Sequence, residues 1–538
     1  MKKFASMILI AIILAGVTLA GCASTGGNAA PEPTAKPSPG IARLVIGSTN
    51  AVTDLNVNDY YLGIFKARTS HQGLISLNPD GSYAPCLAES WESPDASTFV
   101  FHLQKNATWH DGMPVTAKDI KFNLEYFPAK IAEYKQHWGL ISSVETPDDH
   151  TVIIKLKSPN SNFLVNLLVL RAVPEHVFKD VAEPAKFNDA RAMIGCGPYK
   201  FDRFDKQAGT LTFTAFDRYW GGMPAVQSVE FRIFKNQDTM IMALKKGEID
   251  TTYMYSNGIS YYYVPSLLDD PDVGFMMIPF TGVSGALFFN ANKTPYDNAV
   301  FRKAVSYALD YEELKNLFTA GYGTVPNAGF LPNGTYNFKD TPPMARNLNK
   351  SKELLDSIGF KDVDGDGLRE TPDGKKFQPE IFARTDIADY PRLAEMIKKY
   401  LKDVGLDSKI KLADMATTTQ TLNTAKTHEL ALSRTTPWGM MTWAGYGSCY
   451  FDPRNIGYTM TKDPKYLGLV DRMFNATDEA TQRQIAYEMQ DYYASEMPAA
   501  ALYWSDLIQP YNKKYSGWVN DPMYGIMSYG TFYGLHEA

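Results

Sequence analysis

The sequence predicts an α/β protein with two or more lobes. The chain has 538 residues, and a single hydrophobic core stops growing at roughly 250–300 residues. From Ile41 onward, stretches with the two-residue periodicity of strands alternate with stretches of helical periodicity. Apolar residues make up 45% of the chain and charged residues 21%, as in ordinary globular proteins. This composition excludes disorder, collagen-like repeats and coiled coil as the main architecture.

The N-terminus has the pattern of a secretory signal peptide over residues 1–21. Two lysines precede an apolar run that is shorter than the ~20 residues a membrane-spanning helix needs. The sequence LAGC that follows resembles a bacterial lipobox, which implies that Cys22 is lipidated and begins the mature chain. A plain signal peptide with a chance cysteine is the alternative. Residues 22–40 are rich in Gly, Ala, Pro, Ser and Thr, a composition that predicts a flexible tether.

The strands and helices that follow are predicted from periodicity and capping residues. Alternation of apolar and polar residues predicts strands at 42–48, 98–103, 151–157, 210–216 and 226–234. Thr116 precedes one predicted helix as its N-cap, and Asn236 precedes another that ends at Gly247. Helical periodicity predicts further helices at 297–309, 351–358, 390–404 and 479–492.

The charge argues against a nucleic-acid-binding protein, and the absence of familiar catalytic motifs lowers the expectation of an enzyme. The net charge of -6 lacks the basic excess that nucleic-acid binding requires. The four cysteines form no C-x-x-C pair and the eight histidines no H-E-x-x-H motif, so no zinc or iron–sulfur framework is expected. Neither a G-x-S-x-G elbow nor a phosphate-binding loop occurs, although catalytic triads can be dispersed in sequence. Cys86 and Cys196 are expected to be buried as small apolar residues.

One acidic loop has the spacing of a calcium site. Its candidate ligands are Asp362, Asp364, Asp366, Glu370 and Asp373. They fall at positions 1, 3, 5, 9 and 12 of a calcium loop, with glycine at position 6, although aspartate replaces the usual glutamate at position 12. The alternative is a polar turn in which glycine supplies a positive φ. No other cofactor is expected.

Five sequence blocks follow one another along nearly the whole chain after the tether. They are LNPDGSYAPCLAESWES at 77–93, a block with TWHDGMPVTAKD at 101–127, one with GCGPYKF, DRYWGGMP and ALKKGEID at 195–250, VFRKAVSYALDYEEL within 300–326, and KELLDSIGFKDVDGDGLRE within 347–375. Together the blocks resemble the family 5 extracellular solute-binding proteins, which are peptide and nickel receptors of ABC importers.

This resemblance implies a bilobal, periplasmic-binding-protein-like fold of type II with a hinge between the lobes. It also implies the extra domain of the peptide/nickel class, inserted in the first lobe. The expected boundaries are 41–76 with 195–283 and 508–538 for the core of lobe I, 77–194 for the inserted domain, and 284–507 for lobe II.

The resemblance also implies which residues contact ligand between the lobes. Peptide receptors of the family carry a tryptophan followed closely by an aspartate that pairs with the peptide ammonium. Here Trp443 is followed by Tyr446, and Asp452 stands further along the chain. The same region is similar to the R-T-W-G…Y-D-P pattern of the nickel-chelate receptors, so both ligand classes stay open. Trp443 and Tyr446 could also be packing residues of the cleft wall.

Three residues of the first lobe complete the candidate site. The sequence LRAVP around Arg171 resembles the place where nickel-chelate receptors hold a carboxylate. His137 and Tyr60 resemble pocket residues of the same receptors, although a structural role is the alternative for His137. Because Arg171 lies in an apolar run, its guanidinium needs an anionic partner. A ligand carboxylate and an internal Asp or Glu are both open.

The function implied is that of a lipid-anchored substrate-binding protein of an ABC importer, without bond chemistry. Its ligand is a short peptide or a metal chelate, and its partners are a permease with its ATPase and, through Cys22, the membrane. The protein is expected to be a monomer on the extracytoplasmic face, in a periplasm or at the outer cell surface. A surface-anchored hydrolase and a sensor of peptide signals are the rival functions.

Overall fold

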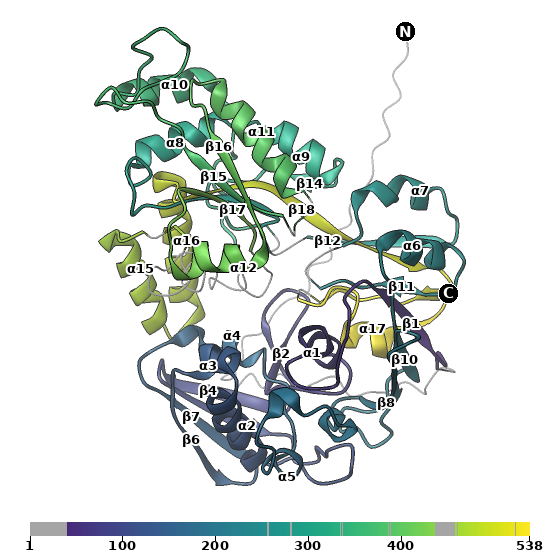
Figure 1. The fold of residues 1–538 in the computed structure, drawn as a ribbon. Helices are drawn as coiled ribbons and strands as arrows, with labels where there is room; N and C mark the ends of the chain where they lie inside the picture. The colour runs from purple at the N-terminus through teal and green to yellow at the C-terminus, as the bar shows by residue number, and fades with distance from the viewer. Residues whose placement is uncertain are drawn as a thin grey trace, which may run out of the picture. The chain divides into compact units, whose positions relative to one another are not determined.

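The computed structural model describes most of the chain as strands, helices and short loops (Figure 1). The described residues are 40–255, 258–279, 282–333, 335, 337–385, 387, 389–435, 458–459, 461–521 and 523–538. Within these ranges, no helix is both long enough and apolar enough to cross a bilayer.

A mixed sheet forms the centre of the first lobe. Strand β1 (Leu44–Ser48) lies parallel to β10 (Ser228–Ile233) and to β11 (Thr251–Thr252). Strand β9 (Thr210–Ala215) pairs antiparallel with β10, and β8 (Tyr199–Asp205) pairs with β9. Every residue of β1 is buried, as expected for a strand with neighbours on both edges and cover on both faces.

Helices on this sheet begin at polar caps. Asn236 accepts a hydrogen bond from the backbone of Thr239 at 3.0 Å, which confirms the predicted start of α6. Phe65 of α1 stacks on Phe231 of β10 with ring centroids 4.3 Å apart, so helix α1 is held firmly against the sheet. The helices of this part are α1 (Tyr60–Lys66), α6 (Gln237–Lys245), α7 (Val264–Leu268) and α17 (Tyr529–Gly534).

A second, four-stranded antiparallel sheet lies between residues 88 and 156. Its strand order is β4 (Ala88–Asp95), β5 (Thr98–Leu103), β7 (Thr151–Leu156) and β6 (Ile141–Asp148). Alternate residues of β5 are buried, so the predicted two-residue pattern is confirmed, and their side chains enter one hydrophobic core with the helices. These helices are α2 (Ala117–Lys130), α3 (Ala132–Trp138), α4 (Leu164–Leu167) and α5 (Glu175–Phe178).

Helix α2 begins as the sequence predicts. Thr116 and Asp119 form a capping box, in which the backbone of Thr116 donates to the Asp119 carboxylate at 2.9 Å. The second Asp119 oxygen accepts from the backbone of Glu175 at 3.0 Å. The cap therefore also fixes the start of α5 and the chain that precedes it.

The second lobe is built on a sheet with helices on both faces. Its strands are β16 (Lys409–Ala413), β15 (Glu380–Arg384), β17 (Leu430–Ser433) and β13 (Gly285–Phe289), in that spatial order. Leu287 and Phe289 enter one core, whereas Ala286 and Phe288 enter another, because successive side chains of a strand point to opposite faces. The helices are α8 (Ala299–Ala308), α9 (Tyr311–Thr319), α10 (Leu348–Ser357), α11 (Tyr390–Lys402), α12 (Met415–Thr418), α15 (Pro464–Asn475) and α16 (Glu479–Glu496).

One long strand belongs to both sheets. Strand β18 (Ala499–Asn512) has 14 residues. Its first part pairs with β13 and with β14 (Gly323–Thr324), and its second part pairs with β12 (Val273–Pro279) and β11. The two central sheets are thereby continuous through β18, as Figure 1 shows in yellow. The boundary expected at 507/508 falls inside this strand.

The remaining elements are short. They are β2 (Ile75–Leu77), β3 (Tyr83–Pro85), β19 (Tyr515–Ser516) and β20 (His536–Glu537), with 3-10 turns at Ser161–Phe163, Pro184–Lys186, Ala190–Met193 and Tyr261–Tyr263 and a π turn at Thr419–Thr424. Cys86 and Cys196 are free thiols in buried positions, which confirms the prediction for them.

Candidate ligand-binding site

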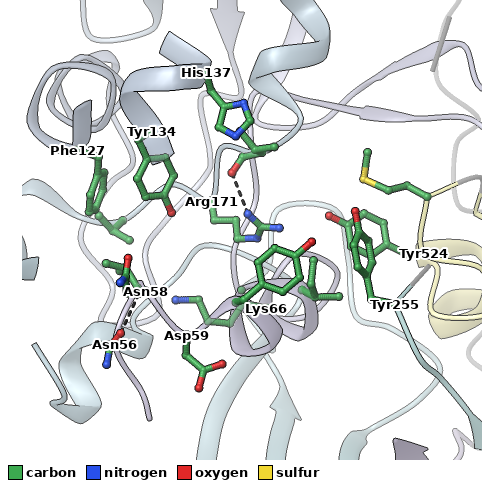
Figure 2. Close-up of a pocket in the computed structure, with 17 residues that line it drawn as sticks. Asn56, Asn58, Asp59, Lys66, Phe127, Tyr134, His137, Arg171, Tyr255 and Tyr524 are labelled. Atoms are coloured by element: carbon green, nitrogen blue, oxygen red, sulfur yellow. Dashed lines mark hydrogen bonds between the residues drawn. The ribbon is translucent and has the colours of Figure 1, made fainter. Parts of the chain in front are cut away.

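Helix α1 forms one side of a pocket in the first lobe (Figure 2). The helix begins at Asp59, whose Oδ1 accepts from the backbone of Leu62 at 2.9 Å. Its Oδ2 accepts from the backbone amides of Thr53 at 2.7 Å and Asp54 at 3.1 Å. In the last turn, Lys66 lines the pocket although only 3% of it is exposed. The capping carboxylate is therefore fully engaged, whereas the lysine amine faces the cavity.

The segment from 169 to 173 forms a second side of the pocket. Val173 is held by the side chain of Asn123 on α2, which accepts from its amide at 3.0 Å and donates to its carbonyl at 2.7 Å. Ala172 donates its amide to the carbonyl of Gln72 at 2.9 Å. These bonds fix the backbone that directly follows Arg171, whose side chain Figure 2 shows reaching into the cavity.

The last part of the wall comes from distant segments of the chain. Tyr134 and His137 project from α3, and Tyr255 follows β11. Tyr524 is placed by Asp521, which caps its turn by accepting the amide of Tyr524 at 2.9 Å. The other Asp521 oxygen accepts from Arg68, from Nε at 3.0 Å and Nη2 at 2.8 Å.

The Arg171 guanidinium is incompletely satisfied. Its Nη1 donates to the carbonyl of Val169 at 3.0 Å, and its buried Nε finds no hydrogen-bond partner among the described residues. A methyl group placed on Gly63 would lie 3.8 Å from Cζ and Nε of Arg171, so the guanidinium rests over helix α1. No Asp or Glu in the described part of the chain forms an ion pair with it. The internal carboxylate that sequence reasoning left open is thus not found there.

Two further basic groups in the pocket have depressed pKa values. Burial lowers the pKa of Lys66 to about 7, repulsion from Arg171 adds to the effect, and Asp59 opposes it. Burial and then Arg171 lower the pKa of His137 to about 4, so its imidazole is neutral near pH 7. Loss of hydration disfavours the charged form of each group.

The pocket has an excess of positive charge. Among its described lining residues Asp59 is the only carboxylate, and its oxygens already accept backbone hydrogen bonds. Arg171 is always protonated at physiological pH, and Lys66 is close to half protonated there. A cavity with these properties suits an anionic group such as a carboxylate, which an arginine can bind with two parallel hydrogen bonds.

The structure brings together three of the residues expected to contact ligand. Tyr60, His137 and Arg171 all line this pocket. Tyr60 is 53% exposed and contacts Tyr255 edge to face, with ring centroids 5.9 Å apart. The other expected residues, Trp443, Tyr446 and Asp452, lie outside the described residues, as does Cys22.

The acidic loop brings together part of the expected calcium set. Carboxylate oxygens of Asp362, Asp364 and Glu370 lie within 4.8 Å of one another. Asp366 pairs with Lys376 at 3.2 Å, and the same amine lies 3.8 Å from Asp364. Asp373 pairs with Lys375 at 2.7 Å. Calcium binding at this loop stays a prediction.

Sequence reasoning missed several lining residues. Lys66 and Tyr524 had no motif to mark them, and Tyr134 stands one turn before His137 on α3 without a pattern of its own. Tyr255 stands among several tyrosines around Gly258 in the sequence, for which lining the cleft and mere packing were both open, and it lines this pocket. A lysine within the largely apolar run YYLGIFK was the available indication for Lys66, since a buried cation needs a reason.

Comparison with known proteins assigns the chain to one protein family. Residues 82–457 match the family of bacterial extracellular solute-binding proteins, family 5 Middle. A putative ABC transporter peptide-binding protein of Brucella ovis is 30% identical over 292 residues, and the match spans about half of each chain, 52% of both. The dipeptide-binding protein of Escherichia coli is 26% identical over 475 residues, which cover 82% of this chain and 84% of that one. In fold, the chain resembles an oligopeptide-binding protein of Thermotoga maritima, with a TM-score of 0.77 at 20% identity over 92% of this chain and 99% of the other.

Replacing Lys66 by methionine should stabilise the ligand-free protein, because it removes a charge that is costly to bury. The pKa of Lys66 is about 7 in the folded chain, against an ordinary value of 10.5. Between these values the unfolded chain binds more protons, so the wild type gains stability as pH rises. At about pH 6 both states are protonated, and Lys66→Met should there raise the free energy of unfolding by about 2–4 kcal/mol.

Denaturant unfolding at about pH 6 and about pH 10 measures this effect, which should shrink at the higher pH because the folded amine is then neutral. Lys118→Met is the matched control, since that side chain is 69% exposed. An equal gain at both pH values would contradict the account of Lys66.

If the acidic loop binds calcium, added calcium should raise the melting temperature of the wild type. The Asp362→Ala variant should show no such rise, because it loses an oxygen of the cluster. Thermal unfolding with calcium, with magnesium and with a chelator measures the effect. A melting temperature that calcium leaves unchanged rules the site out.

Proposed function

The chain belongs to the family 5 bacterial extracellular solute-binding proteins, and we propose that it is the substrate-binding component of an ABC importer that captures a short peptide. The two lobes close on the ligand about a hinge, and the ligand favours the closed population. The closed complex is then presented to a permease and its ATPase. The protein binds and delivers its ligand without breaking a bond in it.

The observation that carries this proposal is the state of Arg171. A guanidinium in a pocket, with a buried Nε that lacks a partner and no ion pair among the described residues, is suited to receive a carboxylate. A peptide supplies that group at its C-terminus. The phenols of Tyr60, Tyr134, Tyr255 and Tyr524 surround the same cavity and offer apolar surface with polar tips for the rest of the ligand.

The relatives support the peptide as the ligand class. The Escherichia coli protein is a dipeptide-binding protein, and its match covers most of both chains. The Brucella ovis protein is a putative peptide-binding protein of an ABC transporter.

The N-terminus sets the location in this proposal. Lipidation of Cys22 anchors the protein to a membrane, and residues 23–40 tether the lobes on the extracytoplasmic face. Several acyl chains give a stable anchor where one gives only marginal binding. The protein works there as a monomer, with the permease as its partner.

A metal chelate is the second candidate ligand, because of His137. Its imidazole lines the same pocket as Arg171, and its low pKa leaves it neutral and able to ligate a metal near pH 7. In that case Arg171 would hold a carboxylate of the chelator.

Mass spectrometry of the small molecules that co-purify with the natively prepared full chain distinguishes the candidates. Short peptides, released on denaturation, are the expected result. A single non-peptide acid with bound nickel or iron would replace the peptide proposal by the chelate. Intact ligand that disappears over time at catalytic protein concentration would favour a hydrolase and contradict both.

Replacing Arg171 by alanine should weaken binding of the identified ligand by about 2–4 kcal/mol, since a buried charge pair is broken. Isothermal titration calorimetry measures the loss. Arg191→Ala is the control, because that arginine is exposed and pairs only locally with Asp189 at 3.0 Å. Unchanged affinity of Arg171→Ala would remove this residue from the site.

A further inference from the structure

The pocket holds two cations on one face of helix α1. Gly63 lies beneath the Arg171 guanidinium, and Lys66 follows three residues later, a spacing that places two positions on the same face of a helix. Both side chains line one cavity, and Figure 2 shows their nitrogen atoms within it, reached from α1 and from the 169–173 segment.

Neither cation forms an ion pair within the described part of the chain, although the charge of Asp59 favours the protonated form of Lys66. Lys66 makes no ion pair with any residue described there, and Arg171 has only the carbonyl of Val169 and an unpartnered Nε. Asp59, the one carboxylate among the described lining residues, is occupied by the amides of Thr53, Asp54 and Leu62. The other polar lining residues are Asn56, Asn58, four tyrosines and His137.

This arrangement can discriminate between ligands that carry one carboxylate and ligands that carry two. A single carboxylate that forms a two-bond pair with Arg171 leaves the Lys66 amine without a direct partner, and burial then disfavours its charged form. A ligand with two carboxylates can pair directly with both side chains, and the second pair favours the protonated form of Lys66.

We infer that Lys66 is a specificity-determining residue of this pocket, which with Arg171 selects a small ligand carrying two carboxylates. This inference rests on the proposed function in its use of the pocket as the ligand site. For a peptide, it means an acidic side chain beside the C-terminal carboxylate.

Two pairs of probes of matched shape test the inference on the full chain after its ligand has been removed. The dipeptides Ala-Glu and Ala-Gln differ by one charge at nearly constant size. Glutarate and its monoamide differ in the same way and contain no peptide bond. The wild type should bind the dianionic member of each pair about tenfold more tightly or better, measured by calorimetry.

The Lys66→Met variant should reduce this preference to less than about threefold while still binding the amide member. The melting temperature of Lys66→Met should be at or above that of the wild type, because the variant removes a buried charge. In that case a lost preference is not caused by unfolding. If Lys66→Met fails to fold, Lys66→Gln replaces it in the experiment. Lys118→Met, at an exposed position, should keep the full preference.

The outcomes separate this inference from the proposed function. Equal binding of Ala-Glu and Ala-Gln supports a peptide receptor and overturns the selection of two carboxylates. Binding of glutarate that depends on Lys66, without binding of either dipeptide, supports the selection and overturns the short-peptide ligand. If Lys66→Met keeps the preference for the dianionic probes, Lys66 does not determine specificity. If none of the four probes binds, both proposals are overturned.

Discussion

A buried ion pair joins Arg68, just after helix α1, to Asp521 in the turn that carries Tyr524, and both segments contribute to the pocket wall. The partners are 453 positions apart in the chain, and only 8% and 6% of their side chains are exposed. Both Asp521 oxygens are used, one by Arg68 and one by the amides of the turn that presents Tyr524. The Arg68 guanidinium also lies over the Tyr524 ring, 4.2 Å from its centroid. Loss of either partner would leave a buried charge, at a cost of about 3–5 kcal/mol.

Arg68, Arg302 and Arg171 differ in how fully the described residues satisfy their guanidinium groups. Arg68 has its carboxylate, and Arg302 donates to the backbone carbonyls of Tyr296 and Glu496 at distances between 2.7 and 2.9 Å. These two guanidinium groups stabilise the fold because their hydrogen bonds end within it. Arg171 differs in having a single carbonyl and an unpartnered Nε. A fold that satisfies two such groups and leaves the third incomplete, beside a cavity, supports recognition at Arg171.

Strand β18 relates this pocket to the rest of the molecule. It pairs with β13 in the second lobe and with β12 and β11 in the first, so backbone hydrogen bonds connect the two sheets directly. The described pocket walls all belong to the first lobe and its inserted domain.

Local interactions made much of the fold predictable from the sequence. The capping box of Thr116 and the cap at Asn236 depend on residues three apart, and the alternation in β5 depends on six consecutive residues. Arg171 could be marked as a candidate because its apolar surroundings in the chain demand an anionic partner. Tyr60 and His137 were marked by family resemblance, and the tertiary structure alone places all three in one cavity.

The sequence by itself determined the α/β class, the helix and strand starts and the need of Arg171 for an anion, because each follows from residues close together in the chain. Only the tertiary structure decided that this anion is not supplied by the described residues and that Lys66 shares the cavity. A lysine in the last turn of a helix is ordinarily a solvated cation that favours the helix dipole. Here it is buried, and Arg171, more than a hundred positions away in the chain, lies over Gly63 of the same helix and lines the same cavity. Contacts between distant segments leave no pattern within a short window of sequence. Which charged side chains share the pocket could therefore be identified only from the folded chain.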